Sequence, residues 1–132
     1  MMTHPIDAWH KFVANRDPAM LEALLADEVV FHSPVVHTPQ RGKAVTTLYL
    51  RGAMQVLGSP AFRYEREVRG ERDAVLEFVT EIDGITINGV DLIRWDDAGR
   101  IVDFKVMVRP LKAIHILHEK MGELLAQLKQ PS

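Results

Sequence analysis

The sequence has 132 residues, of which 47% are hydrophobic and 26% charged, and its net charge is -2. A chain of this length forms one domain with a sizeable core, so we expect a single domain over residues 1–132. The sixteen basic and eighteen acidic residues are well mixed, which gives no electrostatic basis for binding nucleic acid or an anionic membrane. Because there is no cysteine, disulfides, cysteine metal sites and thiol chemistry are excluded.

The amino terminus lacks the basic and apolar regions of a signal peptide, and no apolar run approaches the length of a transmembrane helix. We therefore expect a cytoplasmic protein. The sequence contains no glycine-rich phosphate loop, nucleophile elbow or paired-acid motif, so no cofactor is indicated. His115 and His118 have the spacing of two ligands on one helix, but no third ligand is in register. We therefore expect a solvated helix face there and no metal site.

The first half of the chain has the apolar spacing of helices. Asp17 followed by Pro18 is typical of an N-cap and a first helical position, and a proline stops the short strand that comes next. The predicted elements, in chain order, are helices over residues 5–15 and 18–26, a strand over 29–33 and a helix over 43–57.

The second half alternates with a period of two, which indicates strands over residues 62–69, 74–82, 85–95 and 100–109, before a helix that opens at Pro110. Asp83 and Gly84 predict a two-residue type I′ hairpin turn. Helices followed by an antiparallel run of strands and a last helix favour an α+β fold. We expect its helices on one face of a curved sheet.

Counting outward from the two-residue turn places Leu76 opposite Asp91 and Phe78 opposite Gly89. A four-residue turn over 96–99 would place Phe104 opposite Asp91 and Val106 opposite Gly89. One face of the sheet is then nearly all apolar, and Asp91 is the one acid on it.

A carboxyl group in apolar surroundings is either partnered or protonated, because burial disfavours its charged form. Asp91 is therefore a candidate acid or acid/base in a ligand pocket. The alternative is a buried aspartate that is bonded to a neighbouring donor and has no ligand. Gly89 removes a side chain from the same face, which indicates either a bulge or room for a ligand.

Three segments together resemble one known family: ADEVVFHSP at residues 26–34, RGKA at 41–44 and VDLIRWDDAGRI at 90–101. They are similar to the SnoaL-like group of the nuclear transport factor 2-like superfamily, which includes ketosteroid isomerases and polyketide cyclases. The resemblance implies a cone-shaped α+β barrel, with a curved antiparallel sheet wrapped around the N-terminal helices and an internal apolar pocket. It also implies a homodimer through the outer face of the sheet. The apolar residues expected on that outer face agree with a dimer: Val79, Val90, Leu92 and Met107.

The same resemblance places Asp91 where ketosteroid isomerases keep a neutral acid that donates to the substrate oxygen. Ser33 falls where those isomerases carry the general-base aspartate, and Trp9 falls where they carry a tyrosine of the oxyanion hole. Because serine needs an adjacent base to accept a proton, the isomerase reaction in that form is not expected. The single pocket aspartate of polyketide cyclases is the better match.

We therefore expect Asp91 to be the catalytic residue, with Trp9, Ser33 and Tyr49 orienting a ligand by hydrogen bonds. The remaining candidate pocket residues are Phe31, Phe78, Gly89, Phe104 and Val106. Three functions stay open. The first is a cofactor-independent isomerase, cyclase or lyase that acts on a small, largely apolar, carbonyl-bearing molecule. The second is a non-catalytic small-ligand-binding protein of the same fold, and the third is a dimeric assembly domain.

Overall fold

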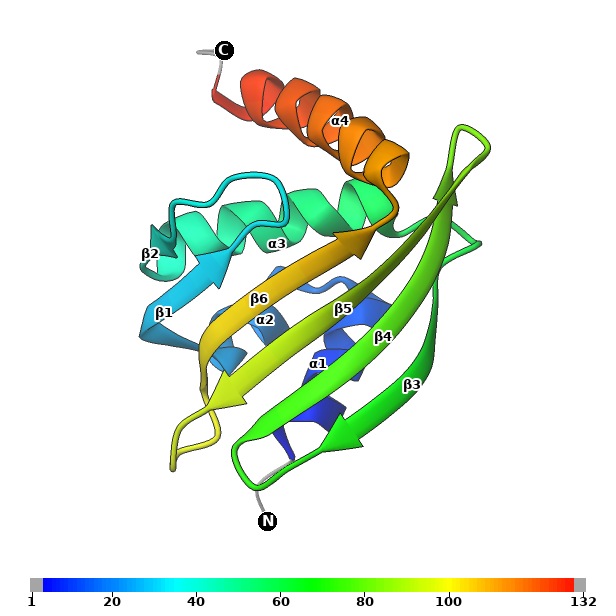
Figure 1. Cartoon of the computed structure of the whole chain (residues 1–132). Coiled ribbons are helices and arrows are strands. Elements are labelled where there is room, and N and C mark those ends of the chain that lie inside the picture. Colours follow the sequence, from blue (N-terminus) through cyan, green and yellow to red (C-terminus); the bar gives the residue numbers. More distant parts are fainter. Residues whose placement is uncertain (1–3, 130–132) are drawn as a thin grey trace.

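The computed structural model describes residues 4–129, and so part of the amino terminus from which the cytoplasmic expectation was drawn lies outside it. Four helices and six strands make up the described chain (Figure 1). The helices are α1 Pro5–Asn15, α2 Pro18–Leu24, α3 Lys43–Leu57 and α4 Leu111–Lys129. The strands are β1 Leu25–His32, β2 Gln40–Arg41, β3 Arg63–Arg69, β4 Asp73–Ile82, β5 Ile85–Trp95 and β6 Ile101–Arg109. The α+β class predicted from the sequence is confirmed.

All six strands belong to one open sheet, with the order β2-β1-β6-β5-β4-β3. The prediction that the sheet is wholly antiparallel was wrong, because β1 runs parallel to β6. The chain leaves β1 through β2 and α3 and then forms the antiparallel β3–β6 meander. Strand β6 therefore ends the meander beside β1 and points in the same direction (Figure 1).

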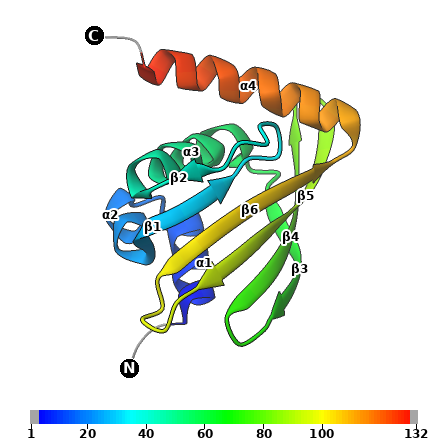
Figure 2. The ribbon, with the colours of Figure 1, turned by 60° about the vertical axis from the view of Figure 1, so that its left-hand side comes forward.

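The sheet is bent, and α1, α2 and α3 lie against its concave face, while α4 crosses its wide end (Figures 1 and 2). The core is formed between the sheet and these helices. Its largest fully buried side chains are Trp9, Phe12, Phe78, Phe104, Ile6, Leu21, Leu25, Leu50, Leu76, Ile87, Ile93 and Ile101. This is the cone-shaped arrangement that the resemblance implied, although the sheet does not close into a barrel.

The start of α2 and the tight turn between β4 and β5 have the structures that the sequence predicts. The carboxylate of Asp17 accepts a hydrogen bond from the backbone N–H of Ala19 at 2.9 Å, and Pro18 opens α2. Asp83 and Gly84 both have positive φ, 51° and 79°, as a type I′ turn requires. The second helix ends two residues before the predicted position, because Leu25 is already extended and pairs with Ile101 of β6.

The register predicted from the two-residue turn is confirmed, with Leu76 opposite Asp91 and Phe78 opposite Gly89. The register predicted for the next hairpin was wrong by two residues. Asp91 pairs with Val106 rather than Phe104, and Gly89 pairs with Val108 rather than Val106.

A turn longer by one residue accounts for half of this shift, since Trp95 pairs with Ile101 rather than Arg100, and a bulge between Arg94 and Trp95 accounts for the other residue. The turn is extended because the carboxylate of Asp96 accepts hydrogen bonds from the backbone N–H groups of Ala98 and Arg100. A shift of two residues preserves the side of the sheet to which each residue points, so Phe104 and Val106 still face inward. The four-residue turn would also turn Val102 inward, but beyond the bulge Ile101 rather than Val102 is fully buried.

Candidate functional site

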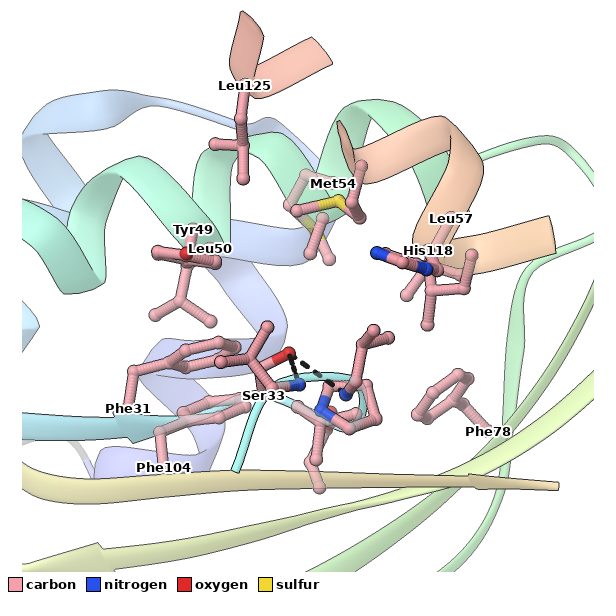
Figure 3. A pocket seen from close by; sticks show the side chains of 18 of the residues that line it. Phe31, Ser33, Tyr49, Leu50, Met54, Leu57, Phe78, Phe104, His118 and Leu125 are labelled. Carbon is pink, nitrogen blue, oxygen red and sulfur yellow. Dashed lines mark hydrogen bonds between the residues drawn. The ribbon is translucent and has the colours of Figure 1, made fainter. Parts of the chain in front are cut away.

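A cavity of about 200 Å³ lies between the concave face of the sheet, α3 and α4 (Figure 3). The sheet forms its floor, and α4 forms its roof. Most of the lining side chains are apolar, and the lining consists of Trp9, Phe31, Ser33, Pro34, Val35, Val36, Tyr49, Leu50, Ala53, Met54, Leu57, Phe62, Tyr64, Phe78, Asp91, Phe104, Val106, Leu117, His118, Met121, Gly122 and Leu125. The cavity therefore suits a small, mostly apolar molecule.

Asp91 lies on the floor of this cavity and is only 6% exposed. The hydroxyl of Tyr64 donates a hydrogen bond to Asp91 Oδ2 at 2.7 Å, and the indole N–H of Trp9 donates to the Tyr64 hydroxyl oxygen at 2.9 Å. Because an indole can only donate, the hydroxyl proton of Tyr64 must point toward Asp91. The relay therefore has one direction, from Trp9 through Tyr64 to Asp91.

Burial raises the pKa of Asp91 to about 7, although the hydrogen bond from Tyr64 opposes the rise. Burial and the nearby Asp91 carboxylate raise the pKa of Tyr64 well above its usual value, despite the hydrogen bond from Trp9. Asp91 therefore gains and loses its proton near neutral pH, while Tyr64 stays a neutral donor. With Oδ2 accepting from Tyr64, a neutral Asp91 carries its own proton on Oδ1.

The structure brings eight of the nine predicted site residues to the cavity wall, and Gly89 is the exception. A Cβ atom on Gly89 would lie 2.4 Å from Cζ of Phe78 and 2.8 Å from the carbonyl oxygen of Met107. The interpretation of Gly89 as room for a ligand was therefore wrong. The missing side chain makes room for the ring of Phe78, which in turn lines the cavity.

Ser33, Tyr49 and Trp9 were all predicted to orient a ligand by hydrogen bonds. The hydroxyl oxygen of Ser33 accepts from the backbone N–H groups of Val35 and Val36, at 3.1 and 3.3 Å, and so shapes the loop at the cavity edge (Figure 3). The phenol ring of Tyr49 stacks on Phe31, with 5.3 Å between ring centroids. The indole N–H of Trp9 donates to the Tyr64 hydroxyl oxygen, and so it is already engaged within the protein.

Sequence reasoning missed Tyr64, the direct partner of Asp91. Regular counting from the β3–β4 turn would place Glu65 opposite Phe78, but a bulge between Tyr64 and Arg66 puts Tyr64 there instead. The signal that could have found it is the alternation of Phe62 and Tyr64 with charged neighbours at the start of this strand.

Sequence reasoning also missed the place of His118, because it assigned His118 and His115 together to a solvated helix face. Both histidines are exposed, but His118 lines the cavity from α4 and His115 is absent from the lining. Within residues 4–129 no cluster of three or more histidines and acids that could hold a metal ion is found. In the same part of the chain, none of the helices is both long and apolar enough to cross a membrane.

A bent open sheet wrapped around helices, with β1 beside the last strand of the meander, is the nuclear transport factor 2-like fold. The chain belongs to the SnoaL-like family, because residues 6–104 match the model of the SnoaL-like domain. The family resemblance seen in the sequence is thereby confirmed.

Solved structures agree with this assignment. A steroid delta-isomerase from Pseudomonas aeruginosa is 39% identical, with a TM-score of 0.89 over 94% of this chain and 90% of that one. An uncharacterised protein with a cystatin-like fold from Silicibacter pomeroyi is 32% identical, with a TM-score of 0.85 over 92% of this chain and 85% of that one. A protein of unknown function from Mesorhizobium loti, 24% identical with a TM-score of 0.69 over 80% of this chain and 88% of that one, shares the fold. Comparison with curated proteins gives no match.

Proposed function

We propose that the protein is a cofactor-independent isomerase that moves a proton within a small, mostly apolar ketone. The observation that carries this proposal is the relay from Trp9 through Tyr64 to Asp91, which ends on the floor of an apolar cavity. A neutral carboxylic acid at this position can donate from Oδ1 to a ligand oxygen while Tyr64 holds Oδ2.

The acid would act on the oxygen of the ketone as negative charge develops there. Removing a proton from the carbon next to a carbonyl group produces an enolate, whose oxygen carries most of the new charge. A donor fixed in an apolar cavity stabilises that charge more strongly than water does, because the donor is already oriented. The 39% sequence identity to a protein described as a steroid delta-isomerase supports the same class of reaction.

The cavity volume supports a small ligand. An apolar cavity of roughly 150 Å³ is known to accept a benzene molecule, and this one measures about 200 Å³. A ketone with one or two rings therefore fits the enclosed space, and the open mouth allows a longer molecule to extend past α4.

The test uses the β,γ-unsaturated ketone 3-cyclohexenone, whose isomerisation to the conjugated ketone is followed by ultraviolet absorbance. Replacing Asp91 with asparagine keeps the shape but removes the exchangeable proton, and we expect turnover to fall by about 10²–10³-fold. The control is Asp103→Asn on the neighbouring strand, whose carboxylate bonds to His32 and does not line the cavity. Turnover by the Asp91→Asn protein equal to that of the unchanged protein would overturn the acid role.

A second candidate is a binding protein without chemistry, and one observation favours it. Ser33 occupies the position expected for a base, and among the described residues its hydroxyl bonds only to backbone N–H groups. Stoichiometric binding of the ketone with no conversion would support this candidate over the enzyme. The presence of the cavity argues against the third candidate, an assembly domain whose pocket is filled by its own side chains.

We propose that the protein is a homodimer formed through the outer face of the sheet. Met107 on that face is 50% exposed, and Val79, Val90 and Leu92 beside it are only partly buried. Met107→Lys is expected to shift the sedimentation coefficient from dimer to monomer, whereas Leu111→Lys, at an apolar residue of α4 that is 69% exposed, is expected to leave it unchanged. A monomeric unchanged protein would contradict the proposal.

A further inference from the structure

The proposed reaction needs a group that takes a proton from carbon, and neither Asp91 nor Ser33 supplies it. Asp91 is occupied as the donor to oxygen, and Ser33 has no base bonded to it among the described residues. The ionisable groups that line the cavity are Asp91, Tyr64, Tyr49 and His118. A phenol is a weak proton acceptor near neutral pH, whereas an imidazole is the side chain best suited to that task.

His118 reaches the cavity from the roof, on the side opposite the sheet floor that carries Asp91. Figure 3 shows its imidazole ring projecting from α4 into the space beside Leu57 and Met54. None of the hydrogen bonds found within residues 4–129 engages this ring, so both of its nitrogens are available to a ligand or to water.

The helix that carries His118 is fixed in place, and there is space beside the side chain. Leu117 is buried, and Lys120 forms an ion pair with Asp83 at 3.2 Å, so α4 is fixed to the β4–β5 turn. Gly122 lies one helical turn after His118 on the same face, and a Cβ atom there would meet nothing within 4 Å. A ligand on the floor can therefore extend upward beside the imidazole.

We propose that His118 is the catalytic base of this site, an inference that rests on the proposed isomerase function. Its neutral ring nitrogen takes the proton from the carbon between the carbonyl group and the double bond. The electrons of that C–H bond form a new C=C bond, and the carbonyl oxygen takes the proton of Asp91. His118 then returns its proton to the γ carbon as Asp91 recovers its own, so no net oxidation, reduction or proton uptake occurs.

The experiment compares His118→Gln with His115→Gln, a matched control one turn away on the same helix that is exposed and does not line the cavity. With 3-cyclohexenone we expect His118→Gln to lower turnover by about 10²-fold, and His115→Gln to match the unchanged protein. Added imidazole should restore turnover in His118→Ala, since the mouth is open to solvent.

Equal turnover by His118→Gln and the unchanged protein, with Asp91→Asn inactive, would overturn the role of His118 and leave the proposed function standing. The affinity for the saturated analogue cyclohexanone, which binds but cannot isomerise, tells whether His118 acts as a base or only shapes the cavity wall. A loss of turnover that only follows a loss of cyclohexanone binding, without rescue by imidazole, would also overturn the role. Binding without any conversion by the unchanged protein would overturn both proposals.

Discussion

Replacing Asp91 with asparagine should change how the stability of the protein depends on pH. Asparagine has nearly the same shape and can still accept the hydrogen bond from Tyr64, but it has no proton to lose. The pKa of Asp91 is raised from an ordinary 3.8 to about 7 in the folded protein. Between these values the unfolded chain releases a proton that the folded protein retains, so stability falls as pH rises.

The magnitude follows from the two pKa values. Each unit of difference between the two pKa values corresponds to about 1.4 kcal/mol. Protonated Asp91 contributes its full stabilisation below about pH 4, and this contribution declines by about 4 kcal/mol as the pH rises to about 7. Above that pH no further change arises from this group. The asparagine protein lacks this decline, so its advantage over the unchanged protein should grow across the interval by the same amount.

Urea unfolding followed by tryptophan fluorescence, at closely spaced pH values, measures both proteins. Acids whose pKa is lowered, such as Glu67 and Glu77, are common to both proteins and cancel in the difference. Two parallel curves of unfolding free energy against pH would refute the reasoning, because they would mean that Asp91 titrates alike in the folded and unfolded chain.

Two further predictions concern the neighbours of Asp91. Gly89→Ala should lower the unfolding free energy by about 1–3 kcal/mol, because the new Cβ collides with the ring of Phe78. Gly122→Ala is the control, and since it has open space in a helix it should stabilise slightly in the same thermal unfolding assay; equal changes would contradict the packing account. Tyr64→Phe removes the donor that lowers the pKa of Asp91 and should raise that pKa by about one unit, as measured by carboxyl carbon chemical shifts; an unchanged or lower pKa would contradict the relay.

Features set by local rules were predictable from the sequence. The bounds of α1 and α3 agree with the predicted ranges, because the apolar spacing of each helix coincides with a break at its end, and α1 also has a proline at its start. The position of Asp91 on the inner face followed from the two-residue turn, since Asp83 and Gly84 admit only one register. Most of the side chains that form the sheet floor of the cavity were therefore predicted.

Features set by bulges and by packing between distant elements were not predictable. A bulge inserts a residue without any strong local signal, and two of them decide the site. One, together with a turn longer by one residue, changes the strand partner of Asp91 from Phe104 to Val106, and the other turns Tyr64 inward. The hydrogen bond from the Trp9 N–H to Tyr64 joins residues that lie 55 positions apart in the sequence. The position of His118 in the cavity wall depends on where α4 crosses the sheet, which the sequence does not reveal.

The two halves of the cavity come from different parts of the chain. The segment that matches the SnoaL-like domain ends at residue 104 and includes the acid on the floor, whereas α4 begins at Leu111. The helix that roofs the pocket therefore lies outside the matched segment, and one splice after β6 would exchange it for the corresponding helix of a relative. Such chimaeras would keep Asp91, Tyr64 and Trp9 while replacing the helix that carries His118, so ligand choice could diverge without rebuilding the core.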